Sequence, residues 1–137
     1  MPVQRTEVGI HTERGTHEVV IFLAPDASPE DLLEQEAAFF PAEEDGVVHL
    51  YARSAVVSVV VDDTDDEPLS ELGIPYEKRG VVVCLKTGET IHGNIRFIGR
   101  TRTLDLLNQP ARSFAVRSEG KLHHVAKAHV EHIEEIR

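Results

Sequence analysis

Short apolar runs that alternate with polar residues and turn-forming glycines fill most of the second half of the chain. The stretch "GVVVCLKTGETIHGNIRFIG" (80–99) predicts two strands around a tight turn at "TGE", where Gly88 supplies the positive φ that such a turn needs. Along the second strand the residues of one face are Ile91, Gly93, Ile95 and Phe97, and those of the other face are His92, Asn94 and Arg96. Gly93 inside a strand indicates a sharp bend, as small closed barrels require.

The remainder of this half predicts three further strands. The segment "RSFAVRSEGKLHHVAK" (112–127) is typical of a hairpin with its turn at "SEGK", and "HVEHIEEIR" (129–137) is a last short strand. Between the two hairpins, "RTRTLDLLNQP" (100–110) breaks the alternation. The pattern therefore predicts five short strands with an irregular or single-turn helical segment between the second and third.

A ten-residue phrase occurs twice in the chain. "DLLEQEAAFF" (31–40) and "DLLNQPARSF" (105–114) agree at six of ten positions. The same offset of 74 pairs Gly46 with Gly120, and a one-residue slip in a turn brings the preceding strand into alignment. We interpret the chain as two copies of one unit; the alternative is coincidence between two β-rich segments.

The predicted organisation has three parts. Residues 1–61 form the first repeat, residues 62–79 form an acidic linker that contains proline, and residues 80–137 form the second repeat. In the first repeat, Ser28 as N-cap and Pro29 at the first helical position predict a short helix over 29–38. The predicted fold class is mainly β, with two tandem five-stranded small barrels, or one pseudo-symmetric unit made from them, and with a short helix or turn between the second and third strands of each repeat.

The second repeat resembles the Sm-like (LSm/Hfq-type) small β-barrels. "VVVCLKTGETIHGNIRFIGRTRTLDLLN" (81–108) has the hydrophobic strand, the "NGE"-like turn, the strand glycine and the Asp-x-x-x-Asn-like segment of their first motif. "TRTLDLLNQPARSFAV" and "VAKAHVEHIEE" are similar to an uncharacterised bacterial Sm-like family with an "R-L-S-D-x-L-N" phrase and an "N-K-A-H-I" ending. The likeness covers about residues 80–136 well and 7–61 more weakly.

This resemblance implies two tandem Sm-like barrels of a type that self-assembles. The chain departs from the family at two places. It has "VAK" (125–127) where the family has its second, RNA-contacting motif, and Val19 where the first repeat needs the strand glycine. The usual RNA-contacting residues are therefore not carried over to this chain.

Charge divides the chain unevenly. The net charge is −10 over 137 residues. Residues 1–67 hold three basic and sixteen acidic residues, a net of −13, whereas residues 68–137 hold eleven basic and eight acidic residues, a net of +3. The overall sign argues against wholesale nucleic-acid binding, and only the second half is suited to an anion.

The candidate anion-binding or nucleic-acid-binding residues are Arg96, Arg100, Arg102 and Arg112. Their guanidinium groups suit bidentate binding of phosphate or carboxylate. The competing interpretation is charge complementarity with the acidic first half, within the chain or between subunits. Single-stranded RNA also needs stacking aromatic residues, and the chain has five Phe, two Tyr and no Trp.

Four histidines near the C-terminus are candidate metal ligands: His123, His124, His129 and His132. Imidazole suits zinc or another transition ion, and Glu131 and Glu134 lie nearby in the sequence. No spaced ligand signature is present, and a site would need residues from two strands to converge. The alternative is a set of exposed histidines on strands.

The sequence predicts no catalytic residue, no enzyme activity and no cofactor. It contains no Gly-rich phosphate loop, nucleophile elbow or zinc-hydrolase signature. Asp31 and Asp105, which begin the repeated phrase, are interpreted as a structural pair that caps a helix or forms a turn. Cys84 lies in the apolar run "VVVCLK" and is interpreted as a small buried hydrophobe.

The predicted function is a non-enzymatic binding or assembly module that uses barrel edges and charge complementarity between the repeats. Its partner is another copy of the chain or another protein. The alternative function is binding of RNA or a nucleotide anion through the basic second repeat. Because the chain has no apolar run of membrane-spanning length and no signal-peptide core at its start, we expect a cytoplasmic protein without a membrane partner.

Overall fold

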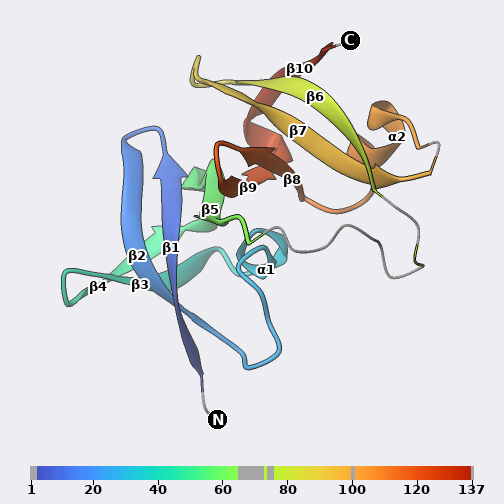
Figure 1. The fold of residues 1–137 in the computed structure, drawn as a ribbon. Coiled ribbons are helices and arrows are strands. Elements are labelled where there is room, and N and C mark those ends of the chain that lie inside the picture. The colour runs from blue at the N-terminus through green and yellow to red at the C-terminus, as the bar shows by residue number, and fades with distance from the viewer. Residues whose placement is uncertain (1–2, 65–72, 74–75, 100, 137) are drawn as a thin grey trace.

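The computed structural model describes residues 3–64, 73, 76–99 and 101–136, and it confirms a mainly β protein. The first half of the described chain (3–64) holds five strands, a short helix between the second and third, and a 3₁₀ turn before the fifth (Figure 1). In chain order these are β1 (Gln4–Thr12), β2 (Gly15–Leu23), α1 (Asp31–Glu34), β3 (Phe39–Glu44), β4 (Val47–Ala52), η1 (Arg53–Ala55) and β5 (Ser58–Asp62).

The second half (76–136) has the same kinds of element in the same order. They are β6 (Tyr76–Leu85), β7 (Thr90–Ile98), α2 (Thr103–Leu107), β8 (Ser113–Ser118), β9 (Lys121–Ala126), η2 (Lys127–His129) and β10 (Val130–Ile136). Strand β6 begins four residues before the expected start of the second repeat at residue 80. The remainder of the expected linker lies largely outside the described residues.

The ten strands of the described residues belong to one antiparallel sheet with the order β10-β6-β7-β8-β9-β5-β1-β2-β3-β4. The five strands of the first half therefore follow the order β5-β1-β2-β3-β4, and those of the second half follow the matching order β10-β6-β7-β8-β9. Figure 1 shows the blue-to-green half and the yellow-to-red half meeting where β5 and β9 lie side by side. Strands β4 and β10 are the two ends of the sheet.

This hydrogen-bonding pattern does not show the two separate barrels that were expected, because a single open sheet runs through both halves. The reason is the pairing of β5 with β9, which spans five residue pairs from Ser58–Val125 to Asp62–Lys121. This pairing uses one edge of each half to join the two halves, so that the strands form one ladder.

Two hydrophobic cores lie along the sheet, one in each half. The first contains Val8, Ile10, Val19, Ile21, Leu23, Leu32, Leu33, Phe40, Ala42, Val56 and Val59. The second contains Val57, Val81, Val83, Leu85, Ile95, Phe97, Phe114, Val116 and Val125. Val57 belongs to the first half by position but packs in the second core, and Ala126 of β9 packs against the first core. Each half thus contributes one side chain to the hydrophobic core of the other half.

The first helix is shorter than the range 29–38 expected from its start signals. It covers only Asp31–Glu34, and its N-cap is Glu30 without a side-chain cap bond. The backbone turns extended at Gln35 (φ −69°, ψ 149°), because the chain must reach the start of β3 four residues later. Leu32 and Leu33 are both buried, so packing rather than helix propensity holds this turn in place.

Strands β7 and β8 approach each other closely at Gly93. A Cβ atom on Gly93 would lie 2.2 Å from the carbonyl oxygen of Arg117 and 3.0 Å from a methyl carbon of Val116. Glycine is therefore required for steric reasons at this point of the strand. The turn between β6 and β7 needs glycine for a different reason, since Gly88 has a φ of 95°.

Candidate assembly interface

The pairing of β5 with β9 joins the two halves and shows how their sheet edges fit together. It is buried at the end where β5 begins: Ser58 is 1% exposed, and Val59 and Val125 are both completely covered, whereas the central pair, Val60 and His123, is only partly buried. The ladder continues by one residue, because the Ala126 N–H donates to Val57 O. The Val57 N–H donates in turn to His11 O on β1, which continues the pairing of β1 with β5. We call this contact the internal junction, defined by β5 and β9.

Two ion pairs join the halves at one end of the internal junction. Asp62 pairs with Lys121, and Asp63 pairs with Arg117, each acidic residue coming from the first half and each basic residue from the second. Asp63 and Arg117 are largely shielded from solvent, whereas Asp62 and Lys121 are exposed. The former pair therefore contributes more to stability than the latter.

At the other end, Glu34 of α1 accepts hydrogen bonds from the second half. The Arg112 N–H donates to its Oε1 over 2.8 Å, and the Ser113 hydroxyl donates to its Oε2 over 2.6 Å. Arg112 also donates from Nη1 to Gln35 O over 3.0 Å. Burial by itself raises the pKa of Glu34, but these hydrogen bonds and the Arg112 charge outweigh burial and hold the pKa below its ordinary value.

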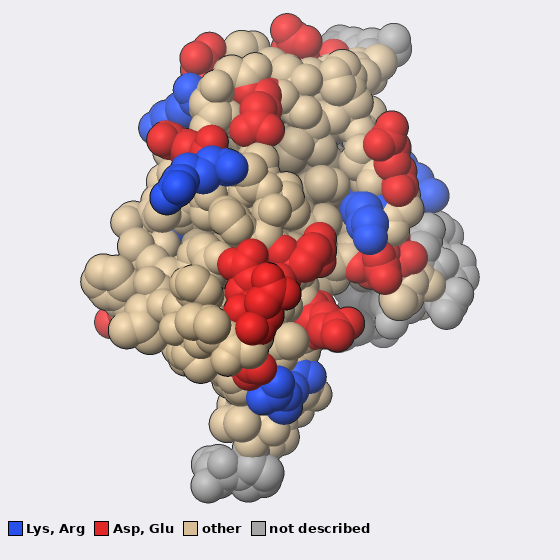
Figure 2. Space-filling model, turned by 90° about the vertical axis from the view of Figure 1, so that its left-hand side faces the viewer, with Lys and Arg blue, Asp and Glu red and all other residues tan. Residues whose placement is uncertain are grey.

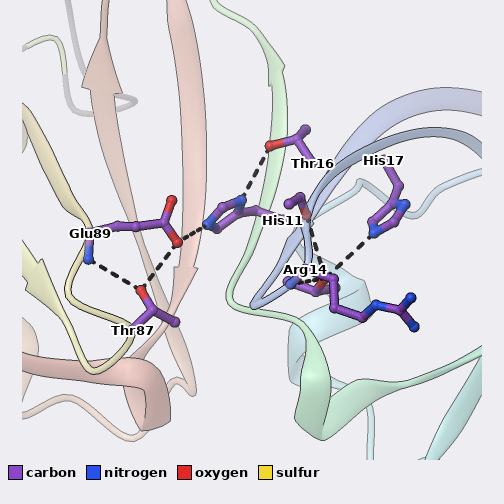
Figure 3. Close-up of polar contacts among 8 residues, drawn as sticks. His11, Arg14, Thr16, His17, Thr87 and Glu89 are labelled. Atoms are coloured by element: carbon purple, nitrogen blue, oxygen red, sulfur yellow. Dashed lines mark hydrogen bonds and ion pairs between the residues drawn. The ribbon is translucent and has the colours of Figure 1, made fainter.

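A polar network extends the contact to the turn between β6 and β7 (Figure 3). His11 on β1 places Nε2 2.9 Å from Glu89 Oε1, and its Nδ1 lies 3.2 Å from the Thr16 hydroxyl. Glu89 also accepts a hydrogen bond from the Thr87 hydroxyl over 3.2 Å. The side chains of His11 and Glu89 thus connect the two halves outside the β5–β9 ladder.

The end strand β4 presents exposed apolar residues where the equivalent strand β9 is covered. Val47, Val48 and Leu50 are all more than half exposed, and Leu50 reaches 70%. The position of β9 that matches Leu50 at the offset of 74 is His124, which lies opposite Val59 of β5 and is only 6% exposed. Strand β4 therefore has the surface of a strand that lacks a neighbour.

The opposite end strand, β10, shows the same contrast with β5. Its C-terminal Ile136 is 55% exposed, and His132 and Glu134 are exposed as well. The residue of β5 that matches His132 is Ser58, which is buried in the internal junction. Within the described residues, the equivalents of β9 and β5 are thus the two end strands of the sheet, β4 and β10.

The arginines predicted as an anion site lie in separate surroundings. Arg102 donates two hydrogen bonds to Asp105, from Nε over 3.0 Å and from Nη2 over 3.2 Å, and Arg112 contacts Glu34 and Gln35 at the internal junction. Arg96 lines a cavity of about 280 Å³ beside β8, and Arg100 lies outside the described residues. On the face drawn in Figure 2, acidic side chains gather at the centre and basic ones lie in separate groups.

The four predicted metal ligands also point to different places. His124 is buried beside Glu30, with 3.6 Å between His124 Nδ1 and Glu30 Oε2, and His129 Nε2 lies 2.8 Å from Ser54 O. Burial lowers the pKa of both His123 and His124, and the charge of His11 lowers that of His123 further. His132 lies apart from them, next to Glu131 and Glu134.

The predicted structural pair lies in the first turn of each helix, with Asp31 as the first residue of α1 and Asp105 as the third residue of α2. Asp31 Oδ2 accepts a hydrogen bond from the Ser28 N–H over 2.8 Å, and Asp105 accepts from the Arg102 side chain and backbone. The Arg102 guanidinium lowers the pKa of Asp105. Each carboxylate thus accepts a hydrogen bond from the residue three positions earlier in the chain.

Cys84 is partly buried between β10 and β7. Burial raises the pKa of its thiol, and the carboxylates of Glu134 and Glu131 raise it further. The thiol is therefore protonated near neutral pH unless a cation binds beside it, which makes Cys84 a poor nucleophile.

No protein-family model, curated protein or solved structure matches the chain. In the part of the chain that the structure describes, no helix has the length and apolar character to cross a membrane.

Proposed function

We propose that the protein is a non-enzymatic assembly module built from two Sm-like units, in which β4 of one copy pairs with β10 of the next. The observation that carries this proposal is the internal junction, where the equivalents of these two strands, β9 and β5, already pair within the chain. A second junction of the same kind joins copies head to tail.

Two features support the interpretation as a duplicated unit. The two halves share their element order and their strand order. The turns at Asp45-Gly46 and Glu119-Gly120 also share an unusual backbone, with φ values of 51° and 79° in the first and 50° and 77° in the second. The sequence resembles the Sm-like family, and the edge strands of an Sm-like unit are suited to pairing with further units.

The register of the internal junction specifies the expected contact between copies. Shifting its five residue pairs by 74 positions places His132 opposite Tyr51, Ile133 opposite Leu50, Glu134 opposite His49, Glu135 opposite Val48, and Ile136 opposite Val47. Two of the five pairs are apolar, and the pair of Glu134 and His49 joins a carboxylate to an imidazole. Fully burying one Val, Leu or Ile contributes about 1.5–3 kcal/mol, so this contact has a substantial driving force.

Charge complementarity acts mainly inside the chain in this proposal. Acidic residues of the first half meet basic residues of the second at the internal junction, as in the pairs Asp63–Arg117 and Asp62–Lys121. We call the proposed contact between β4 of one copy and β10 of the next the outer contact. In it, the positions equivalent to Asp62 and Lys121 are occupied by Ile136 and Val47. We infer that charge selects how the halves of one chain meet, and that apolar contacts join separate copies.

The first experiment measures the oligomeric state of the protein by light scattering and sedimentation velocity. Leu50→Lys places a charge in the β4 contact, and it is expected to give a monomer with an unchanged circular-dichroism spectrum, because Leu50 is already exposed. Leu104→Lys is the matched control, since Leu104 on α2 is 58% exposed but lies on neither end strand. A monomeric wild-type protein, or equal association of both variants, contradicts the proposal.

Mixing two variants distinguishes head-to-tail pairing from pairing of identical edges. Leu50→Lys leaves β10 intact, and Ile136→Lys leaves β4 intact, so each is expected to be monomeric alone. Together they should form a heterodimer with one intact junction. If β4 instead pairs with another β4, Ile136→Lys dimerises alone and the mixture forms no heterodimer.

RNA or nucleotide-anion binding through the basic second half is the alternative. We prefer assembly because Arg102 and Arg112 already contact protein carboxylates or carbonyls, which reduces their availability for phosphate.

A further inference from the structure

Three different metal-ligating side chains meet at the outer edge of the second half. Cys84 on β6 lies directly opposite His132 on β10, and Glu134 follows two residues later on the same face of β10. Their sulfur, nitrogen and oxygen atoms all lie within 4.8 Å of one another. Among the described residues, no other group of three or more such side chains is this close.

The chemistry and size of this group suit zinc. Zinc accepts thiolate, imidazole and carboxylate ligands and favours four of them in a tetrahedron. Ligand atoms bound to one tetrahedral zinc are about 3.3–3.8 Å apart, so the three side chains need to move inward by only about 1 Å. The side chains of His132 and Glu134 are exposed and have room for this movement.

We propose that Cys84, His132 and Glu134 bind a zinc ion, and that His49 of the neighbouring copy supplies the fourth ligand when β4 pairs with β10. The three-residue site stands on its own geometry, whereas the fourth ligand rests on the proposed function. Zinc binding at Cys84 forms a Zn–S bond and releases the thiol proton to solvent.

The register of the internal junction identifies His49 as the fourth ligand. Val60 lies opposite His123 in that junction, and the equivalent pair in the outer contact is Glu134 opposite His49. Directly opposed residues of antiparallel strands have Cβ atoms about 4.5–5.5 Å apart and point to the same face. His49 therefore arrives on the face that holds the other three ligands.

The internal junction contains the same four positions with other side chains. Cys84, His132, Glu134 and His49 match His11, Ser58, Val60 and His123, respectively. His11 is near enough to His123 for its charge to lower the pKa of His123, although burial is the larger cause. Cys84 and His49 are thus expected to be close neighbours, and a complete ligand set occurs only at the outer contact.

The first test measures zinc binding by the full-length protein without a tag. After incubation with zinc and dialysis, elemental analysis should find one zinc per chain, and Cys84→Ser should reduce binding at least tenfold in competition with a chromogenic chelator. The control is His92→Ala, which removes an exposed histidine of β7 opposite Val82 and should bind zinc as the wild type does. Cobalt added instead of zinc should give a thiolate-to-cobalt charge-transfer band that Cys84→Ser abolishes.

The second test separates the zinc site from assembly. We expect Leu50→Lys to stay monomeric and still bind zinc through its three own ligands, but more weakly than the wild type. We expect His49→Ala to lose the increase in association that zinc produces in the wild type. Absence of zinc from both wild type and Leu50→Lys overturns the zinc site, whatever the oligomeric state.

The remaining outcomes bear on the fourth ligand alone. If the wild type binds zinc but His49→Ala assembles with the same zinc dependence, His49 is not a ligand. If the wild type binds zinc and stays monomeric, the proposed function and the fourth ligand both fail, while the three-residue site holds.

Discussion

Gly93 offers a sharp test of how the sheet is built, because a single methyl group there meets backbone. The Cβ of Gly93→Ala would lie 2.2 Å from Arg117 O, whereas ordinary contacts begin at 3.4 Å. Strand β8 therefore has to retreat by about 1 Å in a closely packed region. The movement also strains the β7–β8 pairing at Asn94 and Arg117.

The expected cost follows from these two effects. Overpacking a closely packed site costs about 1–3 kcal/mol. Weakening one backbone hydrogen bond adds about 1 kcal/mol. We therefore expect Gly93→Ala to lower the free energy of unfolding by about 2–4 kcal/mol.

The matched control is Gly9→Ala on β1. Its Cβ would meet its nearest neighbours at 3.5 Å, which is an ordinary contact, and its φ lies outside the positive region. This substitution should change the free energy of unfolding by less than about 1 kcal/mol, and it is expected to stabilise slightly by restricting the unfolded chain.

Urea unfolding followed by circular dichroism measures both variants. With a slope of about 2 kcal/mol per molar urea, Gly93→Ala should lower the midpoint by about 1–2 M, and Gly9→Ala should leave it nearly unchanged. Equal midpoints for the two variants would refute the close approach of β7 and β8. A loss of stability in Gly9→Ala alone would refute it as well.

Three further predictions concern the joined cores, pH and RNA. Val57→Ala should lower the free energy of unfolding by about 2–3 kcal/mol and destabilise both halves together in urea, because Val57 comes from the first half and packs in the second core; separate transitions would contradict this. Burial lowers the pKa of His123 and His124 in the folded chain, so the unfolded chain binds more protons, and stability should fall as the pH drops below 6.5. Replacing both with Gln should flatten the dependence of the urea midpoint on pH between about 7.5 and 5.5. Short single-stranded RNA should bind weakly or not at all at low salt; salt-sensitive binding that Arg102→Ala abolishes would favour the alternative function.

Local pattern was sufficient to predict most strands and their turns. Alternating apolar residues mark β7, and Gly88 marks the turn before it, because strand period and turn backbone depend on neighbouring residues. The helix over 29–38 was predicted too long for a related reason. Its start signals are local, but its end depends on where Leu33 is buried and where β3 must begin.

The candidate sites could be predicted only in part. The acidic and basic halves were visible as charge, yet sequence spacing did not show that Glu34 meets Arg112 or that Asp63 meets Arg117. His132 was identified as a possible ligand without its neighbour Cys84, which is 48 positions away by number. A cysteine and a histidine this far apart in the sequence form no short spacing motif, so the pair could not be recognised from the sequence.

The amino-acid order therefore specified the elements of this protein: which segments are strands, where the chain turns and which faces are apolar. The tertiary structure decided how the edges are used, since β5 pairs with β9 and leaves β4 and β10 at the ends of the sheet. The physical reason is that the register between distant strands comes from shape and burial across the whole sheet. A backbone hydrogen bond has the same chemistry at every edge, so local sequence does not choose between partners.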